Sequence, residues 1–166
     1  MCVIVTVGVA GFRGDAAAPF RAAGFAAESA LNPTSAAMPR DAKRLDITAG
    51  GCSCSFYCGD TPERPDPDIA RRRYERKGWS QAKIDRAIEA SHSPRTASRP
   101  NDLHGQFTAA IETLAKQGAR VTLLAHMFSG SFDEPFEIAG TTEMPLEHYL
   151  KTENHFPEDM LVTLVA

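Results

Sequence analysis

The amino-acid sequence predicts an α+β fold, in which a mainly antiparallel five- or six-stranded sheet has helices packed on one face. Three observations lead to this class. β-Branched residues alternate in short runs with a period of two, other runs carry apolar residues at the spacing of a helix face, and the links between runs are short. A length of 166 residues with 43% hydrophobic residues suits one core, so residues 1–166 are predicted to be a single domain.

The first third of the chain is predicted to form three strands and a short helix. Residues 2–9 have the β-branched alternation of a strand. An alanine-rich helix is predicted over residues 16–23, because Asp15 can cap its start and Gly24 can end it in the left-handed conformation. The other two strands are predicted at residues 25–30 and 44–48.

The middle of the chain is predicted to form a helical hairpin over residues 68–77 and 81–90. Polar stretches rich in proline and serine lie on either side of this hairpin. We expect flexible loops there, near residues 60–67 and 92–100.

The last third of the chain has the clearest helix pattern. Asn101 precedes an amphipathic helix over residues 102–117. A strong strand at 121–128 follows, with a predicted antiparallel partner at 136–138 and a last apolar run at 160–165.

Net charge and hydropathy limit the kinds of partner that the protein is expected to bind. The 18 Lys and Arg against 21 Asp and Glu give a formal charge of −3 and an isoelectric point near 5.9. Nucleic-acid binders gain affinity by neutralising phosphates, so this balance disfavours nucleic acid as a partner. No apolar run reaches the roughly 18 residues of a membrane span, and no basic segment typical of a signal peptide opens the chain. The sequence therefore predicts a cytoplasmic protein without membrane contact.

Acidic residues concentrate in the C-terminal part of the chain. Residues 101–166 carry 10 Asp and Glu against 3 Lys and Arg. Such a surface can be merely solvated, or it can dock a basic partner, for which charge complementarity raises the association rate and the specificity. The docking hypothesis names Asp133, Glu134 and Glu137 as contacts with a basic protein surface.

Three of the four cysteines, Cys52, Cys54 and Cys58, fall within seven residues. Thiolates this close can share one Zn²⁺ or Cu⁺ ion, with Cys2 or His126 as a fourth ligand, or can exchange a disulfide. Zinc sites commonly pair two Cys-x₂₋₄-Cys units, and only Cys54 and Cys58 have that spacing. Alternatively, a strand at this place turns Cys52 and Cys54 toward the core, where reduced cysteines act as small hydrophobic residues.

The start of the chain, Met1-Cys2 followed by a β-run, resembles the N-terminal nucleophile amidotransferases. The resemblance implies that Cys2, once Met1 is removed, attacks an amide while its own α-amine acts as the base. Those enzymes also carry a downstream Asn-Gly element that builds the oxyanion site, and this sequence contains no Asn-Gly.

Arginines and aromatic residues are interleaved over residues 71–79. This composition is typical of phosphate contact with base stacking, and also of protein-binding hot spots. The plainer alternative is a solvated helix anchored by its aromatic residues. As partner contacts, the sequence nominates Arg72, Arg73 and Trp79.

No residue is assigned a catalytic role, because no nucleophile elbow, phosphate loop or helical zinc pair of histidines occurs in the sequence. The leading hypothesis is a small, non-enzymatic, bacterial-type binding protein that docks a protein partner and neutralises a toxin or effector, as immunity proteins and antitoxins do. The second hypothesis is a zinc or thiol-redox protein that uses the cysteine cluster. The third is a hydrolase with Cys2 as its nucleophile.

Overall fold

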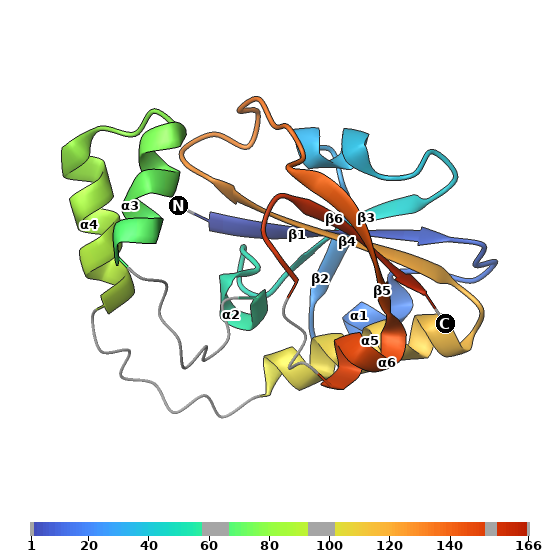
Figure 1. Ribbon diagram of the computed structural model, residues 1–166. Helices are drawn as coiled ribbons and strands as arrows, with labels where there is room; N and C mark the ends of the chain where they lie inside the picture. The colour runs from blue at the N-terminus through green and yellow to red at the C-terminus, as the bar shows by residue number, and fades with distance from the viewer. Residues whose placement is uncertain (1, 58–66, 93–101, 152–155, 166) are drawn as a thin grey trace. The chain divides into compact units, whose positions relative to one another are not determined.

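The computed structural model describes residues 2–57, 67–92, 102–151 and 156–165 (Figure 1). The chain divides into two compact units, Met1–Gly59 with Asp102–Ala166, and Asp60–Asn101, and each is described by itself. The larger unit holds a six-stranded sheet with the order β2-β3-β1-β4-β6-β5. Its strands are β1 (Cys2–Ala10), β2 (Ala26–Ser29), β3 (Lys43–Thr48), β4 (Arg120–Phe128), β5 (Gly140–Pro145) and β6 (Met160–Val165).

The sheet is mixed, with mostly antiparallel pairings. Strand β1 pairs with β3 on one side and with β4 on the other, and both pairings are antiparallel, as are β2 with β3 and β4 with β6. The outer strand β5 pairs with β6 in parallel. The α+β class is therefore confirmed, while the sheet is not purely antiparallel.

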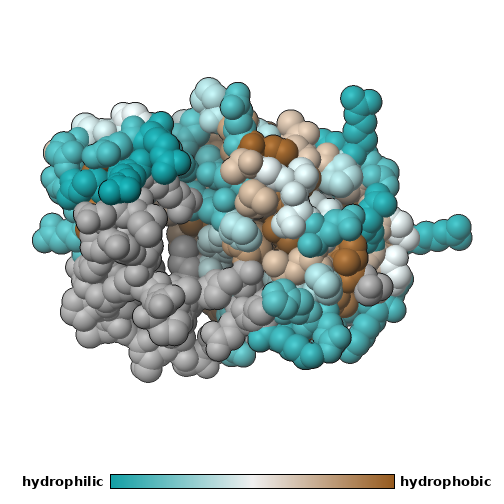
Figure 2. All heavy atoms as spheres, viewed as in Figure 1, coloured by the Kyte–Doolittle hydropathy of each residue, from teal (hydrophilic) through white to brown (hydrophobic). Residues whose placement is uncertain are grey.

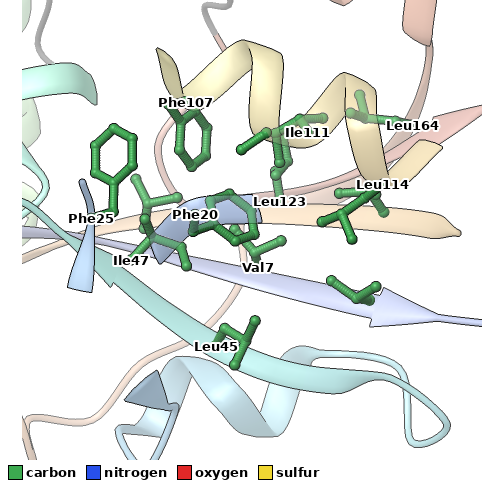
Figure 3. Close-up of a cluster of buried hydrophobic side chains, with 14 of the residues drawn as sticks. Val7, Phe20, Phe25, Leu45, Ile47, Phe107, Ile111, Leu114, Leu123 and Leu164 are labelled. Atoms are coloured by element: carbon green, nitrogen blue, oxygen red, sulfur yellow. The ribbon is translucent and has the colours of Figure 1, made fainter. Parts of the chain in front are cut away.

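Helices of the larger unit supply most of the aromatic part of the core (Figure 3). The rings of Phe56 and Phe107 stack with centroids 4.7 Å apart, and Phe25 meets Phe56 edge-on at 5.0 Å. Beneath them lie the apolar side chains of β1 and β4, including Val7 and Leu123, which are fully buried. The helices of this unit are α1 (Ala18–Ala22), the 3₁₀ helix η1 (Pro33–Ala37), α2 (Cys54–Tyr57), α5 (Leu103–Lys116) and α6 (Leu146–Lys151).

The opposite face of the sheet buries polar side chains. Thr6 alternates with the core valines of β1, and its Oγ1 lies 2.7 Å from Oγ1 of Thr34 in η1. A Cβ atom at Gly8 would lie only 3.0 Å from Sδ of Met38, so glycine lets the chain after η1 approach the sheet. Because η1 covers this second face, the expectation that the helices pack on one face is not confirmed.

The predicted antiparallel strand at residues 136–138 is wrong. This segment is not a strand; the ring of Phe136 instead packs against the His126 imidazole with centroids 4.7 Å apart. The strand begins at Gly140, and α6 then carries the chain back so that β6 can run parallel to β5. The sequence reading missed both β5 and α6.

A strand at the cysteine cluster does not form either. Ser53 fixes the chain there, because its N–H donates to the Val3 carbonyl (2.8 Å) and its Oγ donates to the Ile47 carbonyl (2.5 Å). The carbonyl of Ser53 accepts from Tyr57 N–H, which closes the helical turn of α2. The two-face alternation predicted for Cys52 and Cys54 is therefore absent.

The smaller unit is the predicted helical hairpin, with α3 (Pro67–Arg76) and α4 (Gln81–His92). An ion pair between Arg71 and Asp85 (2.9 Å) joins the two helices. The visible surface of the hairpin is mainly hydrophilic, whereas that of the larger unit also shows apolar residues (Figure 2). The loops predicted near residues 60–67 and 92–100 lie outside the described residues except at Pro67 and His92. Among the described helices, none has both the length and the apolar character needed to cross a membrane.

The aromatic core generates a stability prediction. Phe107 is 2% exposed and meets three other phenylalanine rings, so Phe107→Ala should lower the free energy of unfolding by about 3–5 kcal/mol. Urea unfolding followed by circular dichroism measures this loss. The control is Leu31→Ala, at a side chain that is 91% exposed, where the change should stay within about 0.5 kcal/mol. A loss below about 1 kcal/mol for Phe107→Ala would contradict the described core.

Candidate functional site

Two groups of polar side chains lie on the face of the sheet opposite the aromatic core. We call the first the acidic pocket; it is built around Glu28, Asp46 and Asp133. The second is the histidine–carboxylate cluster, formed by His126, Glu134, Glu158 and Asp159.

The acidic pocket has a volume of about 530 Å³. Its carboxyl groups come from three segments: Glu28 from β2, Asp46 from β3, and Asp133 from the loop over residues 129–139. Two of the most exposed large apolar side chains, Leu31 (91% exposed) and Phe132 (49%), also line it. Its described lining residues include no Lys or Arg, and they are Ile4, Ala26, Glu28, Ser29, Leu31, Asn32, Asp46, Thr48, Gly51, Phe132 and Asp133.

Glu28 and Asp46 are held together by strand pairing. They are directly opposite each other in the antiparallel β2–β3 ladder, so the register fixes two carboxyl groups on one face. Asn32, which follows β2, caps η1 by accepting a hydrogen bond from Thr34 N–H (3.0 Å). The Asn32-Pro33 sequence thus ends the strand and turns the chain over the pocket.

A closed ring of side-chain contacts surrounds Asp46. One oxygen of Asp46, Oδ1, lies 2.8 Å from Thr6 Oγ1, and the other, Oδ2, accepts from Asn32 Nδ2 at 2.6 Å. Thr34 Oγ1 completes the ring, because it contacts both Thr6 Oγ1 and Asn32 Oδ1. If Asp46 is ionised, the ring has only three protons to donate, one each from the Thr6 hydroxyl, the Thr34 hydroxyl and the Asn32 amide. Four contacts need four donated protons, so one contact then lacks a donor. Protonation of Asp46 supplies the missing donor.

The environment of Asp46 favours that proton. Burial raises the pKa of the Asp46 carboxyl above its ordinary value, and the neighbouring Glu28 carboxylate acts in the same direction. Hydrogen bonds from Thr6 and Asn32 oppose the increase without cancelling it. The Asp46 carboxyl therefore keeps its proton to a higher pH than an exposed aspartate does.

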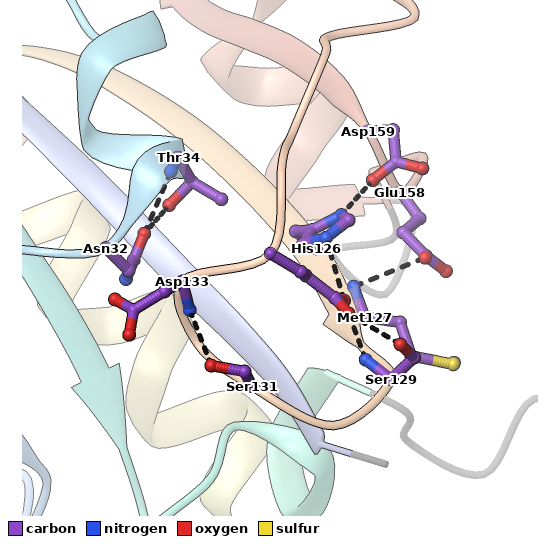
Figure 4. A network of polar contacts seen from close by, with 10 residues as sticks. Asn32, Thr34, His126, Met127, Ser129, Ser131, Asp133, Glu158 and Asp159 are labelled. Carbon is purple, nitrogen blue, oxygen red and sulfur yellow. Dashed lines mark hydrogen bonds and ion pairs between the residues drawn. The ribbon is translucent and has the colours of Figure 1, made fainter. Parts of the chain in front are cut away.

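The histidine–carboxylate cluster centres on a buried imidazole (Figure 4). The side chain of His126, on β4, is 8% exposed. Its Nδ1 lies 2.6 Å from Asp159 Oδ1, and its Nε2 lies 3.7 Å from Glu134 Oε1. Nε2 has no hydrogen-bond partner within the described residues. One ligand atom from each of His126, Glu158 and Asp159 lies within 4.8 Å of the other two.

Backbone contacts hold the carboxyl groups of the cluster in place. Asp159 has a positive φ of 62°, its N–H donates to the Ala125 carbonyl (2.8 Å), and its carbonyl accepts from Ala139 N–H (2.6 Å). Glu158 accepts a hydrogen bond from Met127 N–H (3.3 Å). The turn before β6 is thereby fixed to β4.

The loop over residues 129–139 joins the pocket to the cluster (Figure 4). Glu134 folds it back by accepting from Ser129 N–H (2.7 Å) and Ser129 Oγ (2.5 Å). The same loop places Asp133 in the acidic pocket and Phe136 against the His126 ring. Contacts of the cluster thus determine where one wall of the pocket lies.

The structure separates the three acidic residues that the sequence nominated for partner binding. Asp133 lines the pocket, Glu134 belongs to the histidine–carboxylate cluster, and Glu137 is exposed on the loop and lines neither. Their role in docking stays a prediction.

Cys52 and Cys54 are half-buried thiols near Cys2, and Cys54 Sγ accepts a hydrogen bond from Val3 N–H (3.2 Å). Burial raises the pKa of Cys52, and the neighbouring thiols Cys54 and Cys2 add to the increase, which disfavours the reactive thiolate. Cys58 lies outside the described residues. The described cysteines do not form a close group of three ligands, so the zinc hypothesis for this cluster stays a prediction.

The aromatic residues of the hairpin pack against other residues of the hairpin. The Trp79 ring stacks on Tyr74 with centroids 4.4 Å apart, and Lys83 Nζ lies 4.4 Å from the Trp79 ring centroid. Arg72 is exposed, and the position of the Arg73 side chain is outside what the structure describes. These contacts favour the anchored, solvated helix, and partner binding by Arg72, Arg73 and Trp79 stays a prediction.

Several site residues were missed by sequence reasoning. Glu28 and Asp46 pair only through strand register, and Glu158 and Asp159 reach the cluster only because β6 lies beside β4. The period of two in β4 puts His126 on the same strand face as Thr122 and Leu124. This alternation was the signal available in the sequence.

A further pocket, of about 590 Å³, lies between α1 and α5. Its lining is largely alanine and other small or apolar residues, and its single described carboxyl group, Asp15, is paired with Arg21. It offers no group of like charges, so it is a weaker candidate than the acidic pocket.

Comparison with known proteins does not assign a family to this chain. No family model matches it, and neither a curated protein nor a solved structure matches it. The function must therefore be inferred from the site.

The Asp46 ring generates a prediction about pH. The folded chain holds the Asp46 proton at pH values where the unfolded chain has lost it, because the folded-state pKa is raised. This carboxyl then contributes stability that is complete below about pH 3.9 and is lost as pH rises through the folded-state pKa. Urea unfolding of wild type and Asp46→Asn from pH 7 to pH 4 should show wild type gaining stability relative to the variant on acidification. A relative loss on acidification would mean that the structure holds Asp46 as a carboxylate.

Proposed function

We propose that this chain is a non-catalytic binding protein that admits a Lys or Arg side chain of a basic protein partner into the acidic pocket. One observation carries the proposal. A single pocket combines three carboxyl groups with Leu31 and Phe132, two of the large apolar side chains that the described surface exposes most.

This combination matches the two parts of a long basic side chain. The ammonium or guanidinium head is attracted by the carboxyl groups, and the methylene stem can lie along apolar surface. The Phe132 ring adds a face on which a cation can rest. A bound cation also favours the ionised form of Asp46, so the pocket gains charge when it is filled.

The surrounding charge suits the same partner. Residues 101–166 carry 10 acidic against 3 basic residues, a field that speeds encounter with a basic surface. Exposed apolar side chains that are surrounded by polar groups are typical of a protein interface, whose centre is apolar and whose rim is polar. A toxin or effector with a basic surface, the partner class that the sequence favoured, has the chemistry that this pocket recognises.

The direct test uses the basic side chain alone as the probe. ¹⁵N-labelled protein is titrated with N-acetyl-lysine methylamide and N-acetyl-arginine methylamide, and amide shifts are recorded. We expect saturable shifts at Gly51, Thr48 and Asp133, with a Kd on the order of 1 mM, since about 0.3 kcal/mol per non-hydrogen atom gives about 4 kcal/mol. Glu28→Gln and Asp133→Asn should each weaken binding severalfold.

Two controls distinguish the pocket from general acidity. N-acetyl-norleucine methylamide has the stem without the charge and should not saturate the pocket. Glu137→Gln removes an exposed acidic residue of the same loop that does not line the pocket, and it should leave binding unchanged. Equal binding of the norleucine probe, or equal weakening by Glu137→Gln, would contradict the proposal.

A further inference from the structure

The histidine–carboxylate cluster is separate from the pocket proposed to bind the partner. Its imidazole is more than nine-tenths buried and has carboxyl groups on both sides, with Asp159 at Nδ1 and Glu134 facing Nε2. Glu158 adds a third carboxyl group, with an oxygen within 4.8 Å of an imidazole nitrogen and of an Asp159 carboxylate oxygen.

With the ring proton on Nδ1, Nε2 has no hydrogen-bond donor among the described residues. An ionised carboxylate only accepts hydrogen bonds, so the 2.6 Å contact with Asp159 places a proton on Nδ1. In the neutral ring, Nε2 then offers a lone pair, and it faces Glu134 Oε1, which is also an acceptor. A buried acceptor that faces the half-buried Glu134 carboxylate at 3.7 Å is stabilised by a positive charge between the two atoms.

The separation of those two atoms suits a metal ion better than a proton. A shared proton draws nitrogen and oxygen to about 2.7–2.9 Å. Two ligands that are each about 2.1 Å from one zinc ion, at an angle of about 110–120°, lie about 3.4–3.6 Å apart. The observed distance from Nε2 to Glu134 Oε1 is 3.7 Å.

The donor set selects the class of ion. Imidazole nitrogen suits Zn²⁺ and its transition-metal neighbours, and carboxylate oxygen is compatible with them, whereas Cu⁺ prefers sulfur. Carboxylates that accept a hydrogen bond from a metal-bound histidine commonly fix its orientation, which is the position of Asp159 relative to Nδ1.

We propose that His126 and Glu158, together with Glu134, bind one divalent transition-metal ion of the Zn²⁺ class, while Asp159 holds the imidazole from its Nδ1 side. The ion joins β4, the loop over residues 129–139 and the turn before β6. The proposal does not depend on the acidic pocket, and it differs from the zinc hypothesis for Cys52, Cys54 and Cys58, because its ligands are nitrogen and oxygen.

The test uses the full chain, treated with a chelator, desalted and titrated with Co²⁺ as a spectroscopic probe for the zinc site. We expect one Co²⁺ per chain, visible ligand-field bands without a thiolate charge-transfer band, and displacement of Co²⁺ by Zn²⁺. Glu158→Gln should weaken binding about tenfold or more, while its retained oxygen can still accept from Met127 N–H. His126→Gln should abolish the bands, with folding checked by circular dichroism.

Matched controls separate this site from the alternatives. Glu137→Gln, on the same loop but outside the cluster, and Cys54→Ser, in the cysteine cluster, should leave the Co²⁺ affinity unchanged. The proposal is overturned if no saturable Co²⁺ signal forms, which would indicate that a proton alone serves the imidazole. It is equally overturned if Glu158→Gln binds as tightly as wild type, or if Cys54→Ser removes the signal.

Discussion

The rest of the larger unit depends on strand β1, because its side chains alternate between two chemically different faces of the sheet. Its alternate valines enter the aromatic core, while Thr6 and Gly8 face the other way, toward η1. Pairing with β3 and β4 satisfies the backbone on both sides of β1. Polar groups buried on the second face must then find partners in side chains. Both candidate sites arise from that requirement.

The two sites share one structural element, the loop over residues 129–139, whose position follows from side-chain contacts and not from a strand ladder. Glu134 closes it onto Ser129, and Phe136 rests on the His126 ring. These contacts of Glu134 and Phe136 help to set the position of Asp133 in the pocket. The metal proposal and the binding proposal meet at this loop, although each can be tested without the other.

Local patterns predicted the central strands and the long helix, because period-two alternation at β1 and β4 and a helix stripe at α5 depend on neighbours in sequence. The register of Glu28 opposite Asp46 and the approach of Asp159 to His126 depend on contacts far apart in the chain, which such patterns do not encode. The strand predicted at residues 136–138 failed for the same reason. Phe136 packs against the imidazole of His126 instead of entering a strand, and α6 makes the next pairing parallel.

The central claim is that the polar face of the sheet, at the acidic pocket, recognises a basic side chain. Intermolecular nuclear Overhauser effects between a ¹³C-labelled lysine side chain in a short peptide and the methyl groups of the protein test it most directly. The account predicts contacts from the lysine methylenes to Leu31 and Ile4, and to the Phe132 ring. Contacts to Pro19 and Ala109, in the pocket between α1 and α5, would contradict it.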